Sequence, residues 1–151
     1  MRLVTTREEL GSLDGGALKW RRCLEAIERA PRLPRDVAGS VGDSVTFWRE
    51  AGPEHDEPGL TAHHRYLEVV HVLSGRLLVE HAPVSVLEQT EAYRDTTDRM
   101  TLAGHGTVTA LGAGQTVVVG RHEAVRRLRA PGCEVVTAHV TVEGGGSHDD
   151  R

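Results

Sequence analysis

Hydrophobic and polar positions alternate differently in the two parts of the chain. Near the start, Trp20, Leu24 and Ile27 recur at helical spacing, which predicts an amphipathic helix over about 17–30. Pro31 follows directly and predicts the end of that helix. Beyond it the period shortens to that of β-strands, so we expect a helical beginning followed by a sheet structure.

Short apolar or alternating segments, separated by glycine-rich and polar turns, predict the strands. These segments are 44–49, 66–73, 76–81, 99–102, 107–111, 116–119 and 134–142. The Ser74-Gly75 pair between two of them predicts a β-hairpin over 66–81. One helix followed by many short strands predicts a sandwich or small barrel in a single domain over 1–142. We expect the polar, glycine-rich residues 143–151 to form a disordered tail.

Composition narrows the classes of partner. The chain has 151 residues, a formal net charge of −4 and a pI of about 6.1, which argues against nucleic acid as the main partner. It contains neither a secretory signal nor an apolar run long enough to span a membrane. Cys23 and Cys133 are far apart and form no metal-binding pair. We therefore expect reduced thiols and a cytoplasmic location.

One carboxylate stands out in the strongest strand. Both faces of 66–73 are largely apolar, so the strand is expected to be buried on both sides, and Glu68 with it. A buried carboxylate is costly unless it is paired, hydrogen-bonded or bound to a metal. Two interpretations stay open: a structural glutamate satisfied by an arginine or by backbone amides, and a functional carboxylate in a pocket.

The histidines upstream of that glutamate favour the second interpretation. The spacing of the first cupin motif is matched by His63 or His64, Glu68 and Gly75. The resemblance implies a jelly-roll fold with a metal-binding site. The fold class expected is thus mainly β, a cupin-like double-stranded β-helix (jelly-roll sandwich) with an N-terminal helix.

Two of the four cupin ligand positions carry no suitable ligand. Neither Thr61 nor Ala62 supplies the earlier histidine, and Val125 stands where the second motif has its histidine. A tight site needs at least three protein ligands. The candidate set for zinc or another divalent metal is therefore His63, Glu68 and His122, with His139 as the alternative to His122.

The last strand offers a second polar surface. Thr137, His139 and Thr141 share one face, and small, hydroxylated and imidazole side chains suit a barrel lumen that holds a ligand. Exposure of the same face to water is an equal alternative. The charge run Arg126-Arg127 with Arg129 is interpreted as a solvated surface or a subunit contact.

A longer stretch resembles a known family. Residues 63–83, HHRYLEVVHVLSGRLLVEHAP, match the pattern of the YhcH/YjgK/YiaL family, the proteins similar to the β-subunit of evolved β-galactosidase, without a gap. The stretch 91–98 also matches the Tyr-Asp…Asp pattern of that family. The resemblance implies a double-stranded β-helix, a role in sugar metabolism as an anomerase, epimerase or isomerase, and an associated metal. Departures from the pattern occur at Thr61, Val70, Leu77 and Val125.

The sequence leaves three hypotheses for the function of the chain. The first is a sugar-type isomerase or mutarotase in which His63 and Glu68 act as the acid–base pair. The side chains expected to bind the substrate, a sugar or acidic metabolite, are Arg65, Tyr66, Arg76, His122 and His139. The second is a repurposed biosynthetic enzyme that isomerises, cyclises or eliminates on a non-sugar substrate, and the third is a non-catalytic sugar-binding accessory subunit. Open sheet edges also predict a homodimer.

Overall fold

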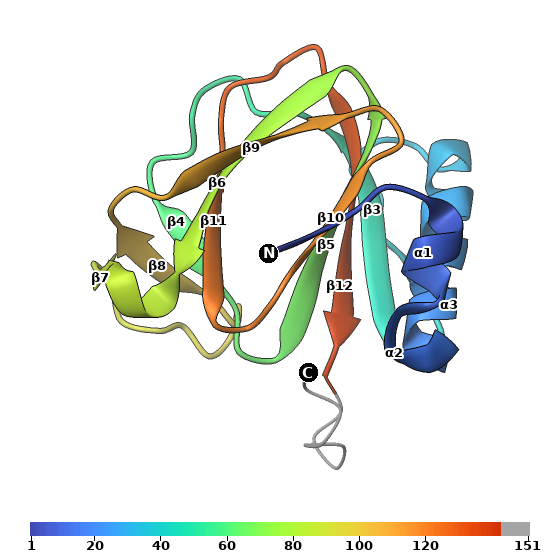
Figure 1. Ribbon diagram of the computed structural model, residues 1–151, viewed down its shortest axis with the longest axis horizontal. Helices are drawn as coiled ribbons and strands as arrows, with labels where there is room; N and C mark the ends of the chain where they lie inside the picture. Colours follow the sequence, from blue (N-terminus) through green and yellow to red (C-terminus); the bar gives the residue numbers. More distant parts are fainter. Residues whose placement is uncertain (143–151) are drawn as a thin grey trace.

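The computed structural model describes residues 1–142 and shows two antiparallel six-stranded sheets that face each other (Figure 1). The predicted tail, 143–151, lies outside the described residues. The first sheet has the order β1-β10-β5-β12-β3-β2 and the second β7-β8-β4-β11-β6-β9. The strands are β1 Arg2–Val4, β2 Gly39–Val41, β3 Val45–Ala51, β4 Leu60–Ala62, β5 Tyr66–Ser74, β6 Arg76–Pro83, β7 Glu88–Gln89, β8 Met100–Ala103, β9 Thr107–Gly112, β10 Thr116–Val119, β11 Glu123–Arg127 and β12 Glu134–Thr141.

Helices cover the outer face of the first sheet (Figure 1). They are α1 Arg7–Gly11, α2 Leu13–Gly16 and α3 Leu18–Arg29, and a 3₁₀ turn, η1 Ala30–Arg32, follows. The helix predicted over 17–30 is confirmed, and its buried stripe includes Trp20 and Ile27. These side chains pack against Phe47 on β3 and Val69 on β5, which removes the outer face of the sheet from water.

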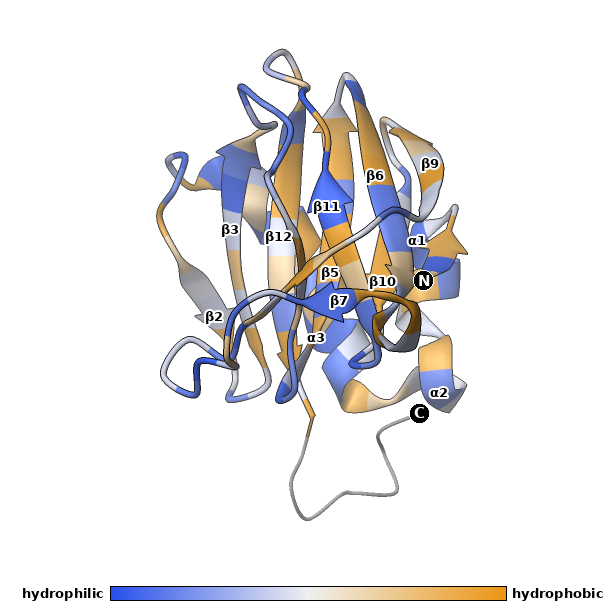
Figure 2. Ribbon diagram, turned by 90° about the vertical axis from the view of Figure 1, so that its left-hand side faces the viewer, coloured by the Kyte–Doolittle hydropathy of each residue, from blue (hydrophilic) through white to orange (hydrophobic). Residues whose placement is uncertain are grey.

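The central strand β5 is buried on both faces, as the sequence predicts. Its Leu67 and Val69 contact the helices, and its Val70 and Val72 contribute to the cluster between the sheets. The neighbouring strand β10 is likewise buried along its whole length, and hydrophobic residues dominate both strands (Figure 2). Because side chains alternate along a strand, Glu68 must point between the sheets.

The space between the sheets is apolar at one end and polar at the other. The register of β12 on β5 places Val135 beside Val72 at the apolar end and His139 beside Glu68 at the polar end. Leu77 and Leu111 on the second sheet complete the apolar cluster. The polar end is therefore where a cavity with chemically active side chains can form.

The predicted hairpin over 66–81 is wrong. A turn does occur at Gly75, which has a φ of 82°, but β5 pairs with β10 and β12 whereas β6 pairs with β9 and β11. The turn thus carries the chain from one sheet to the other. A two-residue glycine turn marks a change of direction, and tertiary packing decides whether the two strands pair.

Five of the strands in residues 1–142 were not predicted from the sequence: β1, β2, β4, β7 and β11. Four of them have only two or three residues, too few to show a period, and β11 contains the arginine run that was interpreted as a solvated surface or a subunit contact.

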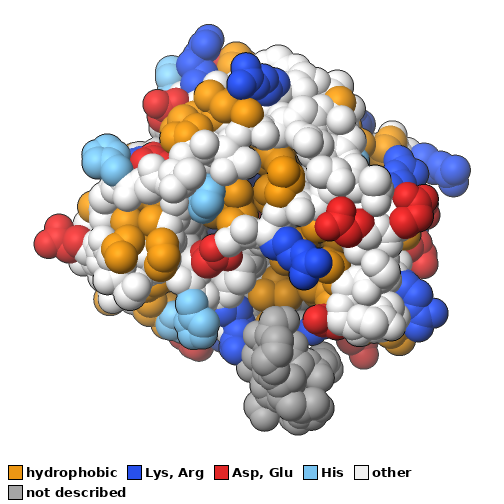
Figure 3. Space-filling view, viewed as in Figure 1, with side chains coloured by type: hydrophobic (Ala, Val, Ile, Leu, Met, Phe, Trp, Pro, Cys, Tyr) orange, Lys and Arg blue, Asp and Glu red, His pale blue; other side chains and the backbone are white. Residues whose placement is uncertain are grey.

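The architecture is mainly β, a jelly-roll sandwich of the cupin type with an N-terminal helix. Among the described residues, no helix is long and apolar enough to cross a membrane. On the face in Figure 3, acidic and basic side chains are interspersed.

Candidate functional site

A cavity of about 210 Å³ lies at the polar end of the sandwich. Its walls come from both sheets and from the loop 52–59. The lining residues are Trp48, Glu50, Glu57, Thr61, His63, Glu68, Arg99, Val125, Arg127, Thr137 and His139. Drug-sized ligands occupy pockets of roughly 300–1,000 Å³, so this cavity suits a smaller, polar molecule.

His63 is buried in the wall and has a hydrogen-bond acceptor at each ring nitrogen. Its Nδ1 lies 2.6 Å from the carbonyl oxygen of Asp98, and its Nε2 lies 3.2 Å from Oε1 of Glu68. A neutral imidazole has only one N–H, so two acceptors favour the doubly protonated ring. Burial opposes the cation, but the hydrogen bond and charge of Glu68 outweigh it and raise the pKa of His63.

Glu68 is held between two cationic partners. In addition to His63, the Nη2 atom of Arg127 donates to Oε2 of Glu68 at 3.1 Å. Burial alone would raise the pKa of this carboxyl, but the bond from His63 and the charge of Arg127 lower it to about 2. Glu68 is therefore ionised at neutral pH and accepts a hydrogen bond from His63.

Arg127 donates hydrogen bonds to several side chains that line the cavity. Its Nη2 also donates to Oγ1 of Thr137 at 2.9 Å, and its Nη1 donates to Oε2 of Glu50 at 3.2 Å. The same Glu50 oxygen accepts from Thr137 Oγ1 at 2.6 Å and from Trp48 Nε1 at 2.8 Å. The buried guanidinium is thus compensated by two carboxylates, which is the condition for a buried charge to be stable.

His139 projects from β12 into the same cavity and has a different environment. Its ring stacks on Tyr66 with centroids 3.8 Å apart and meets the edge of Trp48 at 4.9 Å. Within residues 1–142 its ring nitrogens have no hydrogen-bond partner. Burial lowers the pKa of His139 to about 4 against the opposing charge of Glu68, so its imidazole is neutral and can accept a proton.

The two imidazoles lie side by side. Their ring centroids are 5.7 Å apart, and Tyr66 stacks on both, at 4.5 Å from His63 and 3.8 Å from His139. The pKa of His63 is raised and the pKa of His139 is lowered, so the two rings favour different protonation states. Titratable neighbours whose pKa values are pushed apart in this way are the usual mark of an acid–base pair.

Asp98 fixes the turn that carries His63. Its carboxylate accepts from the backbone N–H groups of His64 at 2.9 Å and Arg65 at 2.8 Å, and from the hydroxyl of Tyr93. Its own carbonyl oxygen receives Nδ1–H of His63. Asp98 is only 2% exposed, so it holds the turn at residues 63–65 from the interior of the protein.

The structure brings some predicted site residues together and separates others. His63, Glu68 and His139 line the cavity, with Tyr66 stacked on both histidines. Arg65 is turned outward and pairs with Asp95 at 3.1 Å. Arg76 is exposed at the start of β6 and does not line the cavity.

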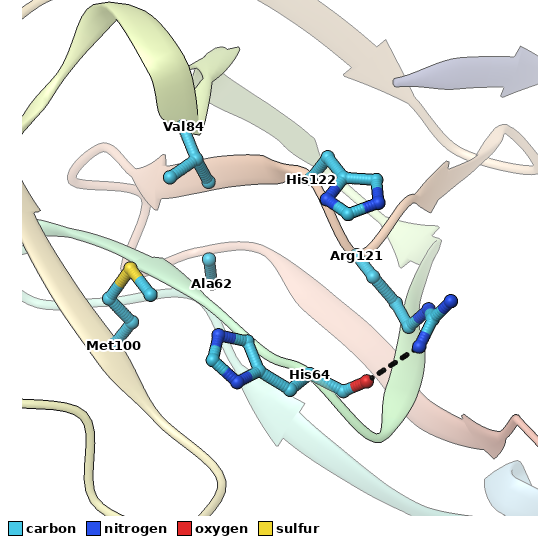
Figure 4. Close-up of a pocket in the computed structure, with 6 residues that line it drawn as sticks. All are labelled: Ala62, His64, Val84, Met100, Arg121 and His122. Atoms are coloured by element: carbon cyan, nitrogen blue, oxygen red, sulfur yellow. Dashed lines mark hydrogen bonds between the residues drawn. The ribbon is translucent and has the colours of Figure 1, made fainter. Parts of the chain in front are cut away.

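His122 lies in a different pocket. It lines a cavity of about 380 Å³ together with His64 and the apolar side chains of Ala62, Val84 and Met100 (Figure 4). On β4, side chains alternate, so Thr61 faces the polar cavity and Ala62 faces the pocket that His122 lines. The ligand set His63, Glu68 and His122 is therefore not assembled.

The residues around Glu68 do not fit a divalent metal. All four positions of the cupin ligands face the cavity, but Val125 offers no donor atom and Thr61 only a neutral hydroxyl. The guanidinium of Arg127 already occupies Glu68 Oε2 and would repel a second cation. Among residues 1–142, no three His, Cys, Asp or Glu side chains converge to hold a metal ion.

Several lining residues were missed from the sequence. The charge run was interpreted as a solvated surface or a subunit contact. Arg129 is exposed and Arg126 pairs with Glu80 at 2.7 Å, whereas Arg127 is buried in the cavity. Alternation within β11 could have indicated this, since Val125 and Arg127 share a face. Alternation along β3 likewise puts Trp48 and Glu50 on the face opposite Phe47.

Comparisons with known proteins give remote likenesses. No family model matches the chain. BH2720 from Bacillus halodurans has a TM-score of 0.49 at 11% identity and covers 77% of each chain. Hydroquinone 1,2-dioxygenase from Sphingomonas sp. TTNP3, with 4-hydroxybenzoate bound, has a TM-score of 0.47 at 14% identity, covering 78% of this chain and 73% of its own.

A cupin-2 domain-containing protein from Shewanella frigidimarina is similar at a TM-score of 0.43 and 14% identity, covering 72% of this chain and 83% of its own. At these TM-scores and identities the likenesses carry no conclusion about fold or activity. The cupin-type fold of this chain is established by its own strand order.

Proposed function

We propose that the chain is a small-molecule isomerase of the sugar mutarotase type that works by acid–base catalysis without a metal. The observation that carries the proposal is the pair His63 and His139, 5.7 Å apart in one cavity, with opposite tendencies to hold a proton. Convergence of these two histidines and Glu68 on one cavity favours catalysis over the accessory-subunit alternative. The resemblance to the YhcH/YjgK/YiaL family supports a sugar as the substrate class.

Ring opening of a cyclic sugar requires two proton transfers, one at each of the two oxygens that are bonded to the anomeric carbon. His139 takes the proton of the anomeric hydroxyl, the bond between the anomeric carbon and the ring oxygen breaks, and the ring oxygen takes a proton from Nε2 of His63. The anomeric carbon becomes a carbonyl. After rotation about the adjacent bond the chain hydroxyl attacks the other face of the carbonyl and gives its proton back to His63. The carbonyl oxygen takes the proton from His139 and becomes the new anomeric hydroxyl, so both histidines regain their starting states.

The geometry suits this reaction better than epimerisation at carbon. The two oxygens that exchange protons are attached to the same carbon, so two adjacent imidazoles can reach both. Abstraction and return of a proton on opposite faces of a carbon would need the two groups across the ligand from each other. The long 3.2 Å contact between His63 and Glu68 is at the upper limit of a good hydrogen bond, so a ligand oxygen can replace Glu68 as acceptor.

Glu68 and Arg127 act as positioning residues in this scheme. The carboxylate keeps His63 protonated and aligned, and the guanidinium keeps that carboxylate ionised. The stacked ring of Tyr66 holds both imidazoles in place. The donor and acceptor are thus preorganised before the ligand enters, which is the main source of rate in such sites.

The test is anomer exchange measured by magnetisation-transfer NMR. Neutral hexoses, uronic acids and hexose phosphates would each be mixed with the full chain at a pH near neutrality, where spontaneous exchange is slow. We expect faster exchange for at least one class, with substrate saturation. No acceleration for any class would refute the proposal and would leave the binding and biosynthetic alternatives.

A further inference from the structure

A second pocket adjoins the catalytic cavity and shares one wall with it. This pocket, of about 340 Å³, is lined by Glu91, Arg94, Thr97, Arg99 and Thr101. Arg99 lines both hollows, and Thr101 of β8 lies directly beside Thr61 of β4, which lines the catalytic cavity. A ligand whose ring occupies the catalytic cavity can therefore extend a substituent past Arg99.

Two arginines face each other across this pocket. Arg94 and Arg99 form an isolated antiparallel bridge, with N–H groups donating to each other's carbonyl oxygens at 2.9 and 3.2 Å. Directly opposed residues of such a pair project their side chains on the same side. Both arginines are exposed, so water screens the repulsion between these like charges, and a bound anion would remove it.

Neither guanidinium has an acceptor within residues 1–142. The nearby carboxylates are engaged elsewhere: Asp95 binds Arg65, and Asp98 binds the hydroxyl of Tyr93 and two backbone amides. Glu91 lines the pocket but makes no ion pair with either arginine. The pocket thus combines two exposed guanidiniums with two threonine hydroxyls, beside the carboxylate of Glu91. Guanidinium and hydroxyl groups are the ones that bind oxyanions.

We propose that this second pocket binds an anionic group, a phosphate or a carboxylate, carried by the same small molecule whose ring reacts at His63 and His139. The assignment of the ring rests on the proposed function, whereas binding of the anion does not. Arg99 then takes the role that the sequence analysis gave to Arg65 and Arg76. The substrate class becomes an acidic or phosphorylated sugar rather than a neutral one.

The test is an NMR titration of the full, isotope-labelled chain with inorganic phosphate and, separately, with acetate, against chloride at matched ionic strength. We expect saturable amide shifts in residues 91–101 with one or both oxyanions and none with chloride. Stronger binding of phosphate indicates a sugar phosphate, and stronger binding of acetate indicates a sugar acid. The Arg94→Gln variant, which leaves the catalytic cavity intact, should bind about tenfold more weakly.

The matched control is Arg76→Gln, which removes the same charge from an exposed strand end outside both pockets. It should bind like the unmodified chain. Absence of saturable shifts, or equal weakening in Arg94→Gln and Arg76→Gln, would overturn the proposal. Oxyanion binding without anomer exchange would refute the proposed function alone, and exchange of neutral sugars without oxyanion binding would refute the second pocket alone.

Discussion

The Nη2 atom of Arg127 lies 3.1 Å from Oε2 of Glu68, at the centre of the cavity where the cupin motif places a metal ligand. A permanent cation of the protein thus compensates the carboxylate that a metal would otherwise bind. Because Val125, two residues before Arg127 on β11, supplies no ligand, the cavity holds an internal ion pair at the position of a cupin metal ligand. The catalytic proposal depends on this ion pair.

Replacing either histidine of the proposed pair should remove catalysis and preserve the fold. For His63→Gln and His139→Gln we expect anomer exchange to fall by roughly 10²–10⁴-fold, the usual contribution of a positioned acid or base. Magnetisation-transfer NMR measures the rate, and circular dichroism checks folding. The control is His55→Gln, which changes an exposed histidine of the loop 52–59. A loss of activity in the control as large as in the other two would contradict the assignment.

The pH dependence of the reaction should be bell-shaped. Activity requires neutral His139, whose pKa is lowered to about 4, so the rate rises as the pH increases through that value. Activity also requires protonated His63, whose pKa is raised above 6.5, so the rate falls at higher pH. The profile of kcat/KM reports both groups in the free enzyme. A rate that keeps rising above neutrality would show that His63 is not the acid.

Arg127 should be a major contributor to stability. The Arg127→Leu variant leaves Glu50 and Glu68 without their shared cation in a buried site, and we expect the free energy of unfolding to fall by about 3–5 kcal/mol. Urea denaturation measures the loss. Arg129→Leu, which alters an exposed arginine two residues away, should stay within about 0.5 kcal/mol of the unmodified chain. Equal stability of the two variants would mean that the ion pair is not buried as described.

Adding Glu68→Gln to Arg127→Leu should recover part of the lost stability, because the neutral amide is less costly to bury than an unpaired carboxylate. The double variant is expected to unfold at a higher urea concentration than Arg127→Leu alone. A double variant less stable than both single variants would argue against coupling between these two residues.

Acid should weaken the fold through Glu68. Its pKa is lowered from 4.5 to about 2 on folding, so the stability it contributes is present above pH 4.5 and is lost as the pH falls from there toward 2. The full effect is on the order of 3 kcal/mol. Urea denaturation as a function of pH should therefore show a smaller decline between pH 4.5 and 2 in Glu68→Gln. An unchanged slope in that variant would contradict the assignment of the lowered pKa to this residue.

The sequence predicted the elements that have a long, regular pattern. The amphipathic stripe around Trp20 predicted the helix, and the doubly apolar strand 66–73 predicted its own burial and that of Glu68. Pairing was predicted less well, because the Gly75 turn connects two sheets and only packing of the whole chain decides which strands meet.

The site was predicted in part for a similar reason. His63 and Glu68 are close in sequence and have a recognisable spacing. His139 was predicted on one face of the last strand, facing either a lumen or water, and strand order decides for the cavity, as it does for Arg127. Charge patterning alone placed Arg127 on the surface, since an arginine run carries no sign of the carboxylates that compensate it. Alternation within β11 places Arg127 on the same face as Val125, but no local pattern identifies the carboxylates that pair with it.

The most direct test of metal-independent catalysis is the rate of anomer exchange after exhaustive chelation, with metal content measured on the same sample by elemental mass spectrometry. The account predicts that the accelerated exchange persists when bound metal is far below one equivalent per chain. Loss of the acceleration on chelation, with recovery on adding zinc, would contradict it and would mean that the cavity rebuilds a metal site despite Arg127.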